Sequence, residues 1–314
     1  MAGNLLQLFP MEYREFWKRV AGDEEVLQEI RLRADRPMII VGRQGERFLD
    51  KNGNYTAFLE EAVCTSEREL AQILQHVCHY SMYAFEDELK QGFLTVAGGH
   101  RVGIAGQAVM DEEHVRTIKN ISFLNIRISH QIKGAADNVL PHIYRNGEVL
   151  NTLIISPPGC GKTTLLRDLI RQVSDGNRYG PGKCVGVVDE RSEIAGCFQG
   201  KPQNDVGMRT DVLDACPKAI GMMMMLRSMS PGVIAVDEIG STADMEAIHM
   251  ASCCGCKILA TMHGDSVRDV EKKVGMERLF REQLFEKFLL LGRENGCPVI
   301  KADRKSTRLN SSHT

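Results

Sequence analysis

The chain lacks any hydrophobic run long enough to cross a membrane, and it carries almost no net charge. A spanning helix needs about 18 to 20 apolar residues in a row, whereas the richest apolar stretch covers only residues 220–226. Residues 1–10 show no basic segment followed by an apolar one, so we expect no signal peptide. The net charge of −2 gives no general electrostatic reason to bind nucleic acid. We therefore expect a cytoplasmic protein without direct membrane insertion and without a strong nucleic-acid signal.

Paired cysteines at zinc-ligand spacing are also missing, although the chain has ten cysteines. Cys253, Cys254 and Cys256 lie close together, but no second pair accompanies them at the spacing of a zinc site. A cytosolic chain of 314 residues does not need a disulfide framework to hold its core. We interpret the cysteines as structural or incidental thiols and keep metal binding as the minor alternative.

The length and the composition predict an ordinary globular protein with two domains. The 314 residues are 43% hydrophobic and 25% charged, which is typical of globular proteins. Residues 1–130 are predicted to form an α+β domain, residues 131–150 a linker, and residues 151–302 a second domain. Residues 303–314 are rich in Ser, Thr, Arg and Asn and look foreign to the chain, so we expect a disordered, non-native tail.

Short-range patterns locate the elements of both domains. Ser66 and Glu69 form a capping-box pattern before an apolar helical repeat, and Gly98-Gly99 separates two strands of a hairpin. The first domain should hold a helix at 12–20 and strands at 29–33, 38–41, 47–49, 93–96, 102–109 and 121–128. In the second domain strands alternate with helices, as in a mostly parallel sheet, and the apolar stretch at residues 220–226, with its four methionines, should form a buried helix face. Its expected strands cover residues 153–155, 185–188, 233–236, 258–260 and 298–300.

The most informative segment is Ser156-Pro-Pro-Gly-Cys-Gly-Lys-Thr163, because it follows an apolar strand and opens an amphipathic helix. A glycine-rich turn in this setting points backbone N–H groups at phosphates, with the positive end of the helix behind them. Lys162 can then reach the β- and γ-phosphates, and the Thr163 hydroxyl can ligate Mg²⁺. The pattern has glycine where this chain has Ser156, a small residue that is compatible with the turn. The predicted ATP-binding residues are Ser156, Pro157, Pro158, Gly159, Cys160, Gly161, Lys162, Thr163 and Thr164.

A second motif, residues 233–238, is an apolar strand that ends in Asp237 and Glu238. Asp237 at the strand tip can hold Mg²⁺ together with Thr163, and Glu238 can orient and deprotonate an attacking water. Such a strand end is common by itself, but beside a phosphate-binding loop it indicates nucleotide hydrolysis.

Two further strand ends carry polar residues whose role the sequence leaves open. Glu190 or Glu193 could lie near the metal or the water, or residues 189–193 could be a solvated strand end. Thr261 or His263 could face the γ-phosphate if their strand lies between the strands of the two motifs.

No arginine of the second domain stands out as the cation that stabilises a transferring phosphate. Arg101, Arg127 and Arg227 are candidates, and each is equally compatible with a surface or interdomain ion pair.

Taken together, these motifs resemble the stage III sporulation protein AA family of spore-forming bacteria. The resemblance lies in SPPGCGKTTLLRD at 156–168, VVDERSEIAG at 187–196, NDVGMRTDVLDACPKAIGM at 204–222 and VIAVDEIG at 233–240. The first domain contributes EIRLRADRP at 29–37 and GGHRVGIAG at 98–106. The resemblance covers nearly the whole chain except its tail.

That family is in turn similar to the hexameric ATPases of type II and type IV secretion. The resemblance implies a RecA-like P-loop NTPase domain with a mostly parallel sheet, preceded by a smaller α+β domain. It implies an ATPase that uses ATP and Mg²⁺, forms a homo-oligomeric ring (a hexamer in relatives), and works on the mother-cell side with membrane proteins of the mother cell–forespore channel complex. It also implies that His263 and first-domain arginines approach the nucleotide, so the expected catalytic residues are Glu238, Lys162, His263, Arg101 and Arg127.

Three other functions are compatible with a phosphate-binding loop. A nucleic-acid-associated ATPase would need a basic surface, which the charge does not supply. A nucleotide-binding assembly scaffold with little turnover would not need Glu238, and a small-molecule kinase would need an acceptor pocket and a lid.

Overall fold

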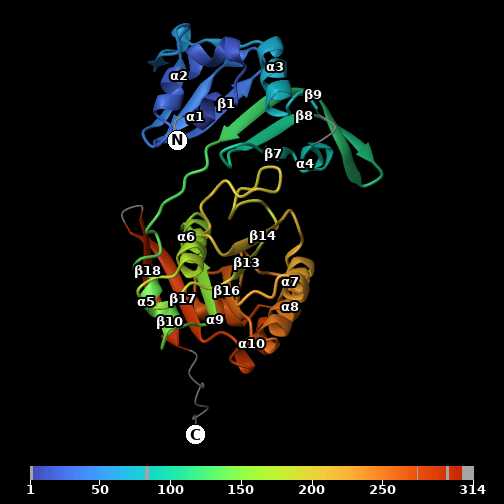
Figure 1. The fold of residues 1–314 in the computed structure, drawn as a ribbon. Coiled ribbons are helices and arrows are strands. Elements are labelled where there is room, and N and C mark those ends of the chain that lie inside the picture. Colours follow the sequence, from blue (N-terminus) through green and yellow to red (C-terminus); the bar gives the residue numbers. More distant parts are fainter. Residues whose placement is uncertain (1–2, 82–84, 274, 295–296, 306–314) are drawn as a thin grey trace. The chain divides into compact units, whose positions relative to one another are not determined.

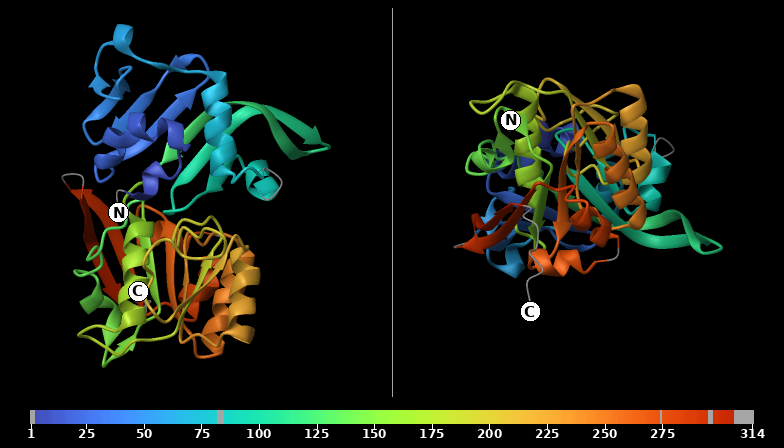
Figure 2. Two further views of the ribbon diagram at one scale, coloured as in Figure 1. Left: turned by 45° about the horizontal axis from the view of Figure 1, so that its top comes forward. Right: turned by 90° about the horizontal axis from the view of Figure 1, so that it is seen from below.

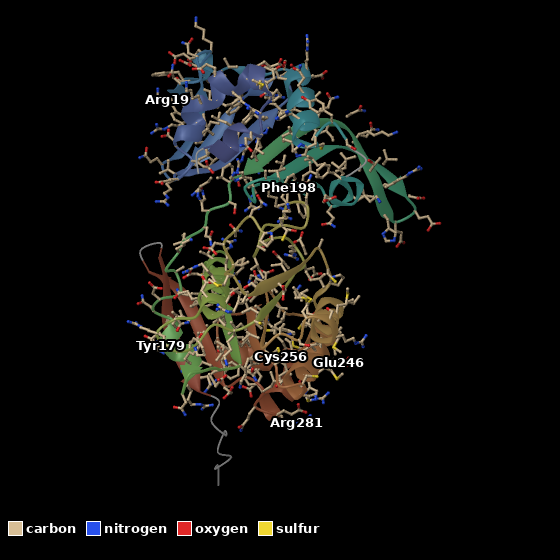
Figure 3. The ribbon with its side chains drawn as sticks, in the orientation of Figure 1. Arg19, Tyr179, Phe198, Glu246, Cys256 and Arg281 are labelled. Carbon is tan, nitrogen blue, oxygen red and sulfur yellow. The ribbon has the colours of Figure 1, made fainter. Side chains whose placement is uncertain are left out.

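The computed structural model describes residues 3–81, 85–273, 275–294 and 297–305, which form two compact units (Figure 1). The first unit extends to His130 and includes the segment Gly196–Gln203, whose Phe198 (Figure 3) packs against the core of that unit. The second unit comprises Gln131–Ala195 and the chain from Asn204 onward. Residues 131–150, expected as a linker, lie inside the second unit, where Ile143 and Val149 are fully buried.

An antiparallel sheet of seven strands forms the first unit, in the order β5-β4-β3-β1-β9-β8-β7. Ile30 and Leu32 of the central strand are fully buried while their neighbours are not, because one face of the sheet packs on the core. Trp17 of the helix α2 (Arg14–Gly22) fills that core and stacks on Phe9 with ring centroids 4.3 Å apart. The strands are β1 (Leu27–Arg33), β3 (Ile39–Gly42), β4 (Gly45–Leu49), β5 (Tyr55–Thr56), β7 (Phe93–Thr95), β8 (Arg101–Asp111) and β9 (His114–Arg127).

The local patterns of the first domain are confirmed. The Ser66 hydroxyl accepts the Glu69 N–H at 3.2 Å, and the Glu69 carboxylate accepts the Ser66 N–H at 2.8 Å, which completes the capping box. Both expected hairpins, β3–β4 and β7–β8, are present. The remaining elements of this unit are α1 (Gly3–Leu6), η1 (Met11–Tyr13), α2 (Arg14–Gly22), β2 (Arg36–Pro37), η2 (Leu59–Glu61), β6 (Cys64–Thr65), α3 (Glu67–Val77) and α4 (Glu86–Lys90).

Strands β8 and β9 continue beyond their neighbours as a two-stranded ribbon (Figure 1). β1 pairs with β9 only at residues 123–127, and β7 pairs with β8 only at residues 101–103. Beyond these pairings the ribbon is largely exposed, and the Met110 side chain is 55% exposed. The expected strand at 102–109 stops short of the tip of this ribbon, and the one at 121–128 omits residues 114–120, because the tip is rich in charged residues.

The second unit contains a sheet of seven strands in the order β14-β13-β15-β16-β12-β17-β18. All neighbouring pairs are parallel except β17–β18, so the expected mostly parallel sheet is confirmed. β16 lies between β12 and β15, which is the placement that would bring its end beside both motifs. The strands are β12 (Thr152–Ser156), β13 (Val185–Asp189), β14 (Thr210–Asp214), β15 (Val233–Val236), β16 (Lys257–His263), β17 (Lys287–Glu294) and β18 (Cys297–Lys305).

Helices cover both faces of this sheet (Figure 2). The helix α6 (Lys162–Asp175) lies on one face, and α7 (Lys218–Ser228), α8 (Thr242–Cys253) and α10 (Met276–Arg281) pack on the other. Strands β12, β13 and β15 are therefore buried along their whole length. The remaining elements are α5 (Leu140–Ile143), β10 (Tyr144–Arg145), β11 (Glu148–Val149) and α9 (Val267–Glu271).

Three features of the second unit differ from the sequence-based expectation. The methionine-rich segment of α7 is buried at Met222 and Met225, but Ile220 and Met224 are 58% and 50% exposed. Strands β14 and β17 were not anticipated. β14 is a short run of mixed polar and apolar residues, and β17 is an apolar run close to a helix, and neither pattern by itself indicates a strand. β18 includes residues 303–305 of the expected tail, and residues 306–314 lie outside the described part. In that part, no helix has both the length and the apolar character needed to span a membrane.

Candidate functional site

Polar groups of the second unit gather at the carboxyl ends of its parallel strands, the edge at which open α/β sheets bind ligands. Three adjacent strands contribute: β12 is followed by the loop of residues 157–161, called the glycine loop below, β15 is followed by Asp237 and Glu238, and β16 ends at His263. Several of these groups are almost inaccessible, with Ser156 and Thr261 at 0% exposure. Because buried polar groups require partners, their contacts define the site.

At two positions of the glycine loop, the backbone has a conformation that only glycine adopts without strain. Gly159 has φ 73° and Gly161 has φ 81°, both in the left-handed region. Gly161 is also the N-cap of α6, so no side chain caps the first N–H groups of this helix. The Ser156 hydroxyl is turned inward and donates to the carbonyl of Pro157 at 2.9 Å. Uncapped N–H groups behind a glycine turn fit an anionic phosphate chain.

Lys162 and His263, both predicted from the sequence, are brought together. The Lys162 Nζ lies 2.9 Å from the Nδ1 of His263, and the lysine is 5% exposed. Burial lowers the pKa of Lys162, and the charges of Glu238 and Asp237 oppose that shift. A partly desolvated ammonium of this kind interacts strongly with any anion that reaches it.

The carboxylate of Glu238 is held from two sides. An ammonium group can only donate, so the His263 Nδ1 accepts from Lys162 and the Nε2 carries the ring proton. This Nε2 lies 2.8 Å from Glu238 Oε1, and the Arg191 Nη1 lies 3.4 Å from Oε2. Lys162, His263 and Glu238 thus form one continuous chain of contacts.

The two predicted metal ligands are also in contact. The Thr163 hydroxyl donates to Asp237 Oδ2 at 2.5 Å. The Thr261 hydroxyl donates to the other oxygen, Asp237 Oδ1, and accepts the N–H of Glu238 at 2.8 Å. A hydroxyl beside a carboxylate is the hard-oxygen donor set that suits Mg²⁺, so the residues present fit this ion. Thr261 was considered as a group that faces the γ-phosphate, but its hydroxyl is fully buried against these acids.

The acidic end of β13 combines a structural residue with an ion pair. Asp189 is 2% exposed and accepts the backbone N–H groups of Glu193, Ile194 and Ala195 at 2.8 to 3.0 Å. Burial raises the pKa of Asp189 to about 6, although these hydrogen bonds oppose the shift. Glu190 forms an ion pair with Lys218. Asp189, Glu190 and Lys218 line a hollow next to Glu238. Its other lining residues are Val188, Arg191, Glu193 and Asp237.

Two arginines of this region were not anticipated. Arg191 contacts Glu238, as described above. Arg167, at 7% exposure, donates from Nε to the Ile194 carbonyl and from Nη2 to the Glu193 carbonyl, both at 2.6 Å. The sequence did carry a signal for Arg167, which is a charged residue within the apolar stretch of α6. A guanidinium buried at such a position must find hydrogen-bond acceptors.

The predicted arginines of the first domain face each other across β8 and β9, where Arg101 and Arg127 are register partners. The Arg101 guanidinium lies 3.5 Å from the ring centroid of Phe93, and Arg127 Nε lies 3.6 Å from Glu29 Oε1. Both belong to the first unit, so their approach to a phosphate stays a prediction. Arg227 is exposed in the last turn of α7.

Comparison with known proteins shows that most of the chain is similar to one protein family. The family described as "Sporulation stage III, protein AA" matches residues 2–309. Stage III sporulation protein AA of Bacillus subtilis (strain 168) is 44% identical over 274 residues, which is 87% of this chain and 85% of that protein.

Solved structures of ATPases share the fold. The ATPase DotB of Legionella pneumophila is 16% identical with a TM-score of 0.58, over 93% of this chain and 79% of that one. The pilus retraction motor PilT, solved with ADP, is 15% identical with a TM-score of 0.60, over 91% and 80%. The ATPase DotB of Yersinia pseudotuberculosis is 13% identical with a TM-score of 0.62, over 96% and 81%. The fold is therefore a RecA-like domain with a mostly parallel sheet, preceded by a smaller α+β domain.

Proposed function

The chain belongs to the sporulation stage III protein AA family, and on that premise we propose that it is an Mg²⁺-dependent ATPase. One observation carries this proposal: Lys162, Thr163, Asp237 and Glu238 meet at one edge of the parallel sheet, joined through His263. These side chains come from three different strand ends, and hydrolysis of a nucleoside triphosphate requires all of their chemistries in one place.

The glycine loop and Lys162 bind the phosphates. Backbone N–H groups of the loop and of the first turn of α6 face the anion, and the ammonium of Lys162 adds a charge-assisted contact. Lys162 must leave the His263 Nδ1 to make that contact. The side chains of Ser156 and Cys160 are buried at 0% and 7% exposure, so both shape the loop from inside.

Thr163 and Asp237 would hold Mg²⁺, in keeping with their direct contact. When bound, Mg²⁺ neutralises negative charge that develops on the phosphate oxygens. Asp237 is the acceptor in this pair, and its second oxygen stays fixed by the Thr261 hydroxyl.

Glu238 acts as the general base. Its carboxylate takes a proton from a water whose oxygen forms a new bond to the γ-phosphorus, while the bond from that phosphorus to the bridging oxygen breaks. The products are ADP and inorganic phosphate. The His263 Nε2–H orients Glu238 before the reaction, as the 2.8 Å contact with Oε1 suggests.

We further propose that turnover drives a secretion-like channel complex during sporulation. The family name supports the process, and the likeness to ATPases that include a pilus retraction motor supports a mechanical use of ATP. In this proposal the chain forms a homo-oligomeric ring, a hexamer, in the mother-cell cytoplasm and contacts the membrane through partner proteins. Arg127 or Arg101 would complete the site.

The test is steady-state release of phosphate from ATP with and without Mg²⁺. Glu238→Gln should lower turnover by about 10² to 10⁴ because it removes the base. The matched control is Glu148→Gln, which neutralises an exposed acid that pairs with Lys183. If the wild type releases no phosphate, or if Glu238→Gln is as fast as the wild type, the catalytic proposal is wrong. Binding of ATP without turnover would instead favour an assembly scaffold.

A further inference from the structure

We propose that Thr261 is the positioning residue of this site, because one buried hydroxyl fixes both catalytic acids, Asp237 and Glu238. The inference rests on the proposed ATPase function and assigns a role that this function does not itself require. Thr261 acts through the two acids and does not touch the phosphates.

Thr261 makes three contacts with the segment that follows β15. Its hydroxyl donates to Asp237 Oδ1 and accepts the N–H of Glu238 at 2.8 Å. Its backbone carbonyl accepts the N–H of Ile239 at 2.9 Å. β15 ends at Val236, which pairs with Ala260, so residues 237–239 lie beyond the regular ladder. Thr261 therefore replaces the ladder for residues 237–239, the segment that carries the two acids.

The backbone of Glu238 explains why such a support is needed. Glu238 has φ 51°, in the left-handed region that side-chain-bearing residues adopt only when their surroundings impose it. The hydrogen bond from its N–H to the Thr261 hydroxyl is a contact that imposes this conformation. Relaxation of φ would turn the carboxylate away from His263, which it now meets at 2.8 Å.

The hydroxyl also joins the metal side of the site to the water side. Asp237 uses Oδ2 for the Thr163 hydroxyl and Oδ1 for Thr261, so Thr261 fixes the rotation of the carboxylate. Thr261 is 0% exposed, which leaves no access for a water that could replace the missing hydroxyl. Removing one hydroxyl group therefore loosens both acids at once.

The experiment compares Thr261→Val, which keeps the side-chain shape, with Thr261→Ser, which keeps the hydroxyl. Thr152→Val is the matched control: Thr152 is also fully buried, lies in the adjacent strand β12, and donates to the Leu150 carbonyl at 2.8 Å. It reports the cost of replacing a buried hydroxyl by a methyl group away from the acids.

Thr261→Val should lower kcat by about 10²-fold, the loss that follows when catalytic groups are misplaced by about 1 Å. KM for ATP should change by less than about threefold, since Lys162 and the glycine loop are untouched. Thr261→Ser should recover most of kcat, and Thr152→Val should keep it. An unchanged kcat in Thr261→Val, an equal loss in Thr261→Ser, or an equal loss in Thr152→Val would overturn the inference.

A readout without nucleotide separates this inference from the ATPase proposal. Amide hydrogen exchange at Glu238 in the nucleotide-free protein should rise about tenfold in Thr261→Val and stay unchanged in Thr152→Val. If the wild type proves unable to hydrolyse ATP, the ATPase proposal fails while the exchange result still decides the role of Thr261. Equal exchange at Glu238 in the wild type and in Thr261→Val contradicts that role.

Discussion

The sheets of the two units bury their strands differently, and this difference shows why one unit reveals a site in its sequence and the other does not. In the antiparallel sheet, buried and accessible residues alternate, as in β1. In the parallel sheet, every residue of β12, β13 and β15 is buried because helices cover both faces. A polar residue directly after such a run stands out, and the strand ends are also where ligands bind.

The two units also differ in how many polar side chains they bury. In the described part of the first unit, the buried polar residues before His130 are Thr56, Thr65 and His100. The second unit buries many more, and Ser156, Lys162, Asp189 and Thr261 lie at or next to the carboxyl ends of its strands. Because burying a polar group is costly, this concentration indicates chemistry more than stability.

The prediction with the largest expected effect tests whether the chemistry belongs to the second unit alone, because it gives an arginine of the first unit a role in turnover. Arg127→Ala should lower ATP turnover by about 10³-fold with little change in ATP binding, as loss of a guanidinium on a transferring phosphate does. Arg127 is preferred over Arg101 because its ion pair with Glu29 is long, at 3.6 Å, whereas the Arg101 guanidinium packs on the Phe93 ring. Turnover and nucleotide affinity measured in parallel check this.

The control for this variant is Arg116→Ala, which removes an exposed arginine from the same strand, β9. Normal turnover in both Arg127→Ala and Arg101→Ala would confine the chemistry to the second unit.

A second prediction sharpens the comparison of burial. Ile155→Ala in β12 should lower the free energy of unfolding by about 3 kcal/mol, because Ile155 is fully buried in the core of the second unit. Ile118→Ala in the ribbon of the first unit should cost less than about 1 kcal/mol, since Ile118 is only partly buried. Urea unfolding of the two variants makes the comparison. Equal losses would mean that the ribbon is as tightly packed as the parallel sheet.

The third prediction concerns acid. Burial lowers the pKa of His100 in the first unit to about 4, below its ordinary value of 6.5. Between these values the unfolded chain binds a proton that the folded chain does not, so His100 makes the protein less stable as the pH falls from about 6.5 to about 4. The loss should be about 3 kcal/mol, from about 1.4 kcal/mol for each pKa unit. Unfolding of the wild type and of His100→Asn at several pH values checks this, because the variant should lose less.

Asp189 in the second unit should act with the opposite sign. Its pKa is raised to about 6, so the folded chain binds the extra proton and stability rises as the pH falls from about 6 to about 4. Asp189→Asn should remove this gain. A wild type whose first and second units respond equally to acid would contradict both assignments.

The sequence was sufficient for several features that depend on neighbours along the chain, although it did not reveal strands β14 and β17. The Ser66 capping box, the strand before the glycine loop, and Asp237 with Glu238 at a strand end all follow from local patterns. The parallel sheet followed from the alternation of strands and helices, and the position of β16 was anticipated as a condition for His263.

Contacts between residues far apart in the chain could not be predicted in the same way. Nothing near Lys162 announces that its partner is His263, 101 residues later. Arg191 was overlooked because an exposed arginine after an acidic strand end is ordinary, and only the folded sheet brings it to Glu238. Thr261 was noticed as a strand-end residue, but its contact with both acids depends on the order of β15 and β16.

The most direct measurement of the central claim follows the fate of ATP bound to Glu238→Gln under single-turnover conditions with excess protein. The account predicts that this variant binds ATP as tightly as the wild type, through Lys162 and the glycine loop, and keeps it as ATP while the wild type converts it to ADP. Conversion of bound ATP to ADP at the wild-type rate would contradict the account.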